Sequence, residues 1–112
     1  MKKKKGVDAK DICPQIWFAL GLCEGEMRQL AGVELVITSG RDGEHQKNSL
    51  HHVGCAVDIR IRRLTPAGKR RLCQHLKLLL DARGYDVVLE SDHLHIEWDP
   101  KKGDAPWLQE VA

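Results

Sequence analysis

Two short stretches of this chain alternate between apolar and polar residues. Residues 55–61 read Cys-Ala-Val-Asp-Ile-Arg-Ile, and residues 92–98 read Asp-His-Leu-His-Ile-Glu-Trp. Because successive side chains of a strand point to opposite faces, each stretch predicts a half-buried strand with one apolar face and one face that carries polar groups. The face with polar groups carries Ala56, Asp58 and Arg60 in residues 55–61, and His93, His95 and Glu97 in residues 92–98.

Two other segments carry apolar residues at helical spacing, and each has the end signals of a helix. The first covers residues 12–30, with Asp11 as its predicted N-cap. The second begins after Thr65, which is a predicted N-cap because proline follows it at the first helical position, and it ends at Gly84. His75 lies on the apolar stripe of this second helix and is interpreted as a partly buried helix residue.

Residues 33–38 and 86–90 are rich in apolar and β-branched side chains and predict two further strands. The resulting order, α-β-β-α-β-β, predicts an α+β fold with a small, mainly antiparallel sheet and helices packed on one side. At 112 residues the chain suits one domain with one core. We assign residues 1–10, which contain the run of four lysines Lys2 to Lys5, to a basic flexible tail and residues 11–112 to this single domain.

Composition limits the classes of partner. A net charge of +2 is too small to predict a nucleic-acid partner, and no apolar run is long enough to span a membrane. We therefore expect no nucleic-acid or integral-membrane association, and we expect a monomer. The four cysteines form no CxxC pair, so buried, reduced thiols are the simplest interpretation, and a thiolate ligand at Cys55 is less favoured.

Three residues have the chemistry and spacing of a catalytic zinc site. His51 and Asp58 lie seven residues apart across Gly54, which suits a loop that leads into a strand, and His95 comes from a later strand. Three protein ligands leave the fourth position of a zinc ion open, as in hydrolases, whereas structural zinc sites are closed. The sequence therefore predicts Zn²⁺ bound by His51, Asp58 and His95.

The general base depends on which histidine is the third ligand. Asp92 lies three residues before His95 and is the favoured base. His93 points to the same face of its strand as His95, so it is the alternative ligand, and the corresponding base would then be Glu90. With His95 as the ligand, His93 becomes a donor to substrate or transition state, and Glu97 orients a histidine from behind.

The pattern Ser-x-His-x-x-Gly-x-Ala-x-Asp over residues 49–58, followed by an acid three residues before a histidine, resembles one zinc peptidase family. This family contains D-Ala-D-Ala carboxypeptidases and L-alanyl-D-glutamate endopeptidases with the hedgehog/DD-peptidase fold, and many of its small members are phage endolysins. Residues 37–41 and 87–97 resemble the family segments before the first ligand and around the last one. The resemblance covers about residues 33–100.

This resemblance implies further site residues. Arg41 and Ser49 would help to hold the substrate, although Arg41 lies one residue earlier than the arginine of the family. His45 and His93 are additional candidates for substrate contact.

The resemblance also implies the reaction and its setting. The expected function is zinc-dependent hydrolysis of peptidoglycan stem peptides by a phage lysis enzyme, which is cytoplasmic before lysis and acts on the cell wall after release. Two alternatives remain from the sequence. One is an inactive metal-binding or cell-wall-binding module, and the other is a phage structural protein with the same fold.

Overall fold

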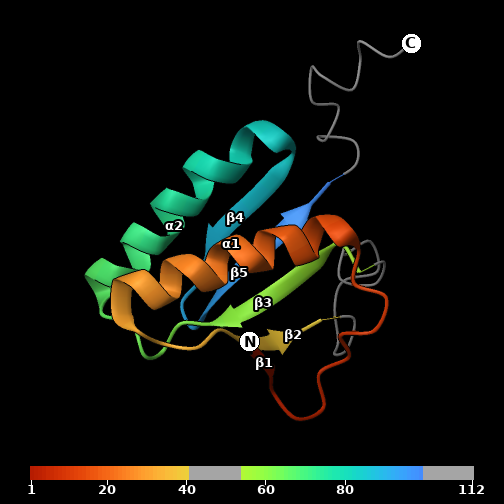
Figure 1. Ribbon diagram of the computed structural model, residues 1–112, viewed down its shortest axis with the longest axis horizontal. Coiled ribbons are helices and arrows are strands. Elements are labelled where there is room, and N and C mark those ends of the chain that lie inside the picture. The colour runs from red at the N-terminus through yellow and green to blue at the C-terminus, as the bar shows by residue number, and fades with distance from the viewer. Residues whose placement is uncertain (41–53, 100–112) are drawn as a thin grey trace.

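The computed structural model describes residues 1–40 and 54–99, which form one sheet covered by helices (Figure 1). The strand order across the sheet is β1-β2-β3-β5-β4. Figure 1 shows α1 and α2 lying over the same face of the sheet. The elements are β1 (Lys2–Lys3), α1 (Pro14–Ala31), β2 (Val36–Ser39), β3 (Ala56–Arg60), α2 (Pro66–Leu80), a 3-10 turn η2 (Asp81–Arg83), β4 (Tyr85–Leu89) and β5 (His93–Trp98).

The sheet is antiparallel in three of its four pairings. Strands β2 and β3, β3 and β5, and β5 and β4 run antiparallel, whereas β1 runs parallel to β2. Adjacent antiparallel strands can be joined by a short hairpin, as β4 and β5 are, without a helical crossover. The predicted α+β class with a mainly antiparallel sheet is therefore confirmed.

The core lies between the sheet and the two helices. Ile59 and Leu94 face it from β3 and β5, while Leu20 and Leu76 face it from α1 and α2, and all four are fully buried. Val57 and Ile59 of β3 and Leu94 and Ile96 of β5 are buried, while the side chains of Asp58, His93, His95 and Glu97 between or beside them stay partly exposed. The alternation predicted for both strands is confirmed, and it places the polar residues on the face away from the helices.

The N-terminus of α2 begins as predicted, whereas the N-terminus of α1 differs from the prediction. Thr65 caps α2, because its Oγ1 accepts a hydrogen bond from the backbone N–H of Gly68 at 3.0 Å. Asp11 was wrongly predicted as the N-cap of α1, which is Cys13, without a side-chain cap. Pro14 explains the shift, because its fixed φ and missing N–H suit the first helical position. In the described part of the chain, no helix is long and apolar enough to cross a membrane.

The structure differs from the basic flexible tail predicted for residues 1–10. Lys2–Lys3 forms β1, in which the backbone N–H of Lys2 donates to the carbonyl of Leu35 at 2.9 Å. Val7 is also buried, with 4% of its surface exposed. The lysine side chains remain in solvent while their backbone pairs with the edge of β2, so a basic composition is compatible with strand pairing here.

Gly54 is the glycine at which an added side chain would cost most. Its φ is +76°, and a Cβ built on it would collide with the backbone carbonyl oxygen of Asp11. We expect Gly54→Ala to lower the free energy of unfolding by about 2–4 kcal/mol. Two costs contribute to this loss, namely the left-handed φ that alanine would have to adopt and the clash of its Cβ with the backbone. The test is urea denaturation of the purified variant.

Gly25 provides the matched control for this prediction. It lies inside α1, and a Cβ there meets no atom within 4 Å. Gly25→Ala should raise stability by about 0.5–1 kcal/mol through helix propensity. Equal effects of the two substitutions would contradict the close approach of Gly54 to Asp11.

Candidate functional site

The candidate site is built on the pairing of β3 with β5. In this antiparallel pair Asp58 lies opposite His95, and Arg60 lies opposite His93. Side chains of directly opposite residues are neighbours, with Cβ atoms about 4.5–5.5 Å apart. The register therefore places a carboxylate and two imidazoles together on the face away from the helices, although they are distant in the sequence.

Asp58 and His95 form the contact of the site that joins β3 to β5. The Nδ1 of His95 donates to Oδ1 of Asp58 at 2.9 Å, and its Nε2 donates to Oε1 of Glu97, also at 2.9 Å. Only 14% of the Asp58 side chain and 19% of the His95 side chain are exposed. The imidazole is thus held at both nitrogens by carboxylates, which fixes the plane of its ring.

This arrangement also favours the protonated form of His95 in the metal-free protein. Carboxylates only accept hydrogen bonds, so the imidazole makes both hydrogen bonds when both of its ring nitrogens carry protons. The hydrogen bond to Asp58 is the main cause that raises the pKa of His95 above its ordinary value, with Glu97 acting in the same direction and burial opposing it. A metal ion at Nδ1 would have to displace one of these protons, which couples metal binding to pH.

His93 and Asp92 form a second contact beside this pair. The Nδ1 of His93 donates to Oδ1 of Asp92 at 2.6 Å, and its Nε2 lies 3.6 Å from Oδ1 of Asp58. Asp92 is largely in solvent, with 84% of its side chain exposed. Asp92 therefore meets the site through His93, while the other nitrogen of His93 faces Asp58.

Glu90 lies on the far side of the same hairpin. Its backbone N–H donates to the carbonyl of His93 at 2.9 Å, which closes the turn between β4 and β5. The side chain of Glu90 is exposed. Both candidate bases, Glu90 and Asp92, thus flank one tight turn at the end of the sheet.

The described donors match part of a zinc site. Asp58 and His95 supply one carboxylate oxygen and one imidazole nitrogen 2.9 Å apart, close to the roughly 3.3 Å that separates two ligands at a tetrahedral zinc ion. Glu97 holds the remaining nitrogen of His95, as carboxylates commonly do behind metal-binding histidines. Within residues 1–40 and 54–99, no group of three or more His, Cys, Asp or Glu side chains is arranged to hold a metal ion.

The predicted site residues divide into two groups. Asp58, His93, His95 and Asp92 are brought together by β3, β5 and the turn before β5, and Glu97 makes the contact with His95 on which its predicted orienting role depends. The remaining candidates, namely Arg41, His45, Ser49 and His51, lie outside the described residues. Sequence reasoning assigned no role to Arg60, although the alternation of residues 55–61 already placed it on the face of Asp58.

Cys55 has the properties of a structural thiol. Only 8% of its surface is exposed, and burial, with the nearby Cys13 thiol, raises its pKa to about 11. All four cysteines are free thiols. The Cys55 thiol is therefore protonated near neutral pH in the metal-free protein.

No family model matches the chain, and no curated protein matches it. The likeness to zinc peptidases thus rests on the residues of the motif.

The contact between Asp58 and His95 predicts a pH-dependent stability of the metal-free protein. Because the folded pKa of His95 is raised, the contact contributes stability that is fully present below the ordinary histidine value of about 6.5 and is lost as the pH rises through the folded pKa. The measurement is the free energy of unfolding between about pH 5 and pH 9 with a chelator present. Asp58→Asn should remove most of this fall, and a variant with the slope of the wild type would contradict the contact.

Proposed function

We propose that this protein is a zinc-dependent peptidase that hydrolyses peptidoglycan stem peptides, of the D-Ala-D-Ala carboxypeptidase or L-Ala-D-Glu endopeptidase type, with a hedgehog/DD-peptidase-like fold. The observation that carries the proposal is the contact of Asp58 with His95, supported from behind by Glu97. Two residues 37 positions apart, singled out by their motif, meet with the chemistry of metal ligands. The five-stranded, mainly antiparallel sheet agrees with the expected architecture.

The proposed zinc ligands are Asp58, His95 and His51. Asp58 and His95 lie among the residues that the structure describes, and His51 is the proposed third ligand. Glu97 keeps the proton on Nε2 of His95, which leaves Nδ1 as the nitrogen that faces Asp58. When bound, zinc supplies Lewis-acid polarisation of the scissile carbonyl. Because β3 and β5 are central strands, the two ligands sit on a rigid scaffold that holds them in place.

Asp92 is the proposed general base. Its exposed carboxylate takes a proton from the attacking water as the water oxygen bonds to the carbonyl carbon. It then returns that proton to the nitrogen of the leaving amine as the C–N bond breaks. His93 connects Asp92 to the site, and its Nε2 faces the region of Asp58, where it can donate to the oxygen that gains negative charge. His93 thus contributes to binding of the transition state.

The setting that the resemblance implies belongs to the same proposal. We infer a phage lysis enzyme that is held in the cytoplasm and reaches the cell wall when the membrane is opened. Its substrate is then the peptide part of peptidoglycan.

The test is digestion of purified peptidoglycan by the zinc-loaded protein, with the new termini identified by mass spectrometry. Release of free D-alanine indicates a carboxypeptidase, and new termini at D-glutamate indicate an endopeptidase. A chelator should stop either reaction. Zinc binding without new termini would favour a cell-wall-binding module, and failure to bind zinc would favour a structural protein.

A further inference from the structure

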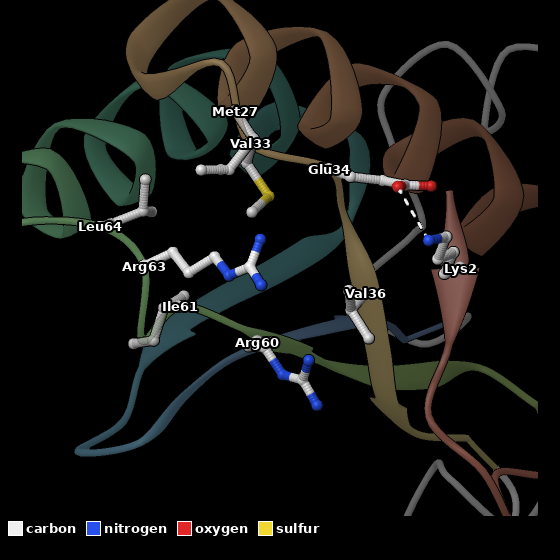
Figure 2. Close-up of a pocket in the computed structure, with 9 residues that line it drawn as sticks. All are labelled: Lys2, Met27, Val33, Glu34, Val36, Arg60, Ile61, Arg63 and Leu64. Atoms are coloured by element: carbon white, nitrogen blue, oxygen red, sulfur yellow. Dashed lines mark ion pairs between the residues drawn. The ribbon is translucent and has the colours of Figure 1, made fainter.

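A second polar region lies where β2 begins and β3 ends, near the C-terminal part of α1. A cavity of about 150 Å³ opens there. Its apolar wall includes Met27, Ile61 and Leu64, each at most 6% exposed. Figure 2 shows Arg63, in the loop after β3, extending beside this wall, and Arg60, the last residue of β3, extending past Val36.

The charged groups around this cavity favour an anion. Lys2 and Glu34 also line it, and they pair with each other through Nζ and Oε2 at 3.6 Å. Within the part of the chain that the structure describes, neither the Arg60 nor the Arg63 side chain has a hydrogen-bond or ion-pair partner. The carboxylate that lines the cavity is thus already neutralised, while two guanidinium groups remain available beside an apolar wall.

Arg60 also links this cavity to the candidate metal site. It lies two residues after Asp58 on the same face of β3, and its partner across the sheet is His93. Two residues of a strand span about 7 Å. A peptide bound at Asp58 and His95 could therefore present a group to Arg60 from a position about two residues away from the scissile bond.

We propose that Arg60 and Arg63 bind a carboxylate of the peptide substrate, with an aliphatic part of the substrate against Met27 and Leu64. This inference rests on the proposed peptidase function. Planar guanidinium groups match the two oxygens of a carboxylate and bind them through paired, charge-assisted hydrogen bonds. The preferred substrate is therefore a peptide with a free carboxylate within about two or three residues of the cleaved bond.

The first experiment compares KM and kcat of Arg60→Gln and Arg63→Gln on a stem peptide with a free carboxylate. Each variant should raise KM by about tenfold or more with little change in kcat, as expected when a charge-assisted contact to the ground state is lost. Amidation of the peptide should raise the KM of the wild type similarly and should add little in the variants. Arg60→Lys keeps the positive charge but loses the paired N–H donors of the guanidinium group. Its affinity for the peptide should therefore lie between those of Arg60→Gln and the wild type.

Arg62→Gln is the matched control, because Arg62 is exposed, lies between the two arginines and does not line the cavity. It should leave KM unchanged. An equal rise in KM for Arg62→Gln, or the absence of any effect of amidation on the wild type, would overturn the inference. Native far-UV spectra of all variants establish that they are folded.

The second experiment separates this inference from the proposed function. Glutarate and inorganic phosphate are titrated into the metal-free protein, and the guanidinium signals of Arg60 and Arg63 are followed by NMR. Glutarate should shift both signals more strongly than phosphate does. Such shifts in a protein without peptidase activity would support the anion site and overturn the proposed peptidase function. Peptidase activity with unchanged guanidinium signals would support the peptidase function and overturn the anion site. Tighter binding of phosphate would overturn the assignment to a carboxylate.

Discussion

Asp58→Ala should abolish tight zinc binding and reduce peptidase activity to background. Asp58 supplies the carboxylate of the proposed ligand set, and its Oδ1 lies 2.9 Å from Nδ1 of His95. Even loss of a residue behind a ligand typically costs about 10–100-fold in metal affinity or activity, so loss of a ligand should cost more. Metal content per chain after dialysis and calorimetric titration with zinc measure the effect.

His51→Ala should reproduce this result, because it is the proposed third ligand. Glu97→Gln should have the intermediate effect of about 10–100-fold, because Glu97 contacts Nε2 of His95 and orients its ring. Asp81→Ala, at the end of α2, is the control for removal of an acid outside the site and should keep full zinc content.

Zinc should also stabilise the wild type, since its ligands come from separate parts of the chain. The melting temperature should therefore rise when zinc is added to the metal-free protein, and this rise should be absent in Asp58→Ala. A wild-type protein that neither binds added zinc nor gains thermal stability from it would contradict the proposed metal site and the peptidase with it.

Asp92→Ala should retain zinc but lose most of its turnover, by about 10²–10⁴-fold, which is the usual contribution of a general base. Asp92 follows the turn between β4 and β5 and accepts a hydrogen bond from Nδ1 of His93 at 2.6 Å. The measurement is kcat on a defined stem peptide, together with metal content of the same sample. The large exposure of Asp92 implies that its removal leaves the fold intact.

Glu90→Ala is the comparison that tests the ligand assignment. It removes the other acid of the same hairpin, and we expect a much smaller loss of turnover. If Glu90→Ala were inactive and zinc-replete while Asp92→Ala stayed active, the histidine ligand on β5 would be His93 in place of His95. The contact distances to Asp58 favour His95, at 2.9 Å against 3.6 Å for His93.

Periodicity in the sequence was sufficient to predict the main elements. Alternation over residues 55–61 and 92–98 predicted β3 and β5 with the correct buried faces, because burial of one face of a strand requires this pattern. Thr65 and the following proline marked the start of α2 for a local reason, since capping involves only neighbouring residues.

The errors occurred where distant contacts decide the structure. Lysines at residues 2–5 have the composition of a solvated tail, yet Lys2–Lys3 pairs with the edge of β2 through backbone groups that composition does not describe. Asp11 has a suitable side chain for an N-cap, but it has a left-handed φ of 59° and lies against the backbone of Gly54. A local sequence pattern cannot predict this contact, because Asp11 and Gly54 are distant in the sequence.

The sequence by itself determined which side chains could form a site, because spacing and alternation put Asp58, His93, His95 and Glu97 on polar faces of two strands. Only the tertiary structure decided which of them meet. The register of β3 against β5 sets Asp58 opposite His95 and Arg60 opposite His93. A slip of one residue would turn one strand's polar face towards the core, so burial of Ile59, Leu94 and Ile96 enforces this register and thereby the site.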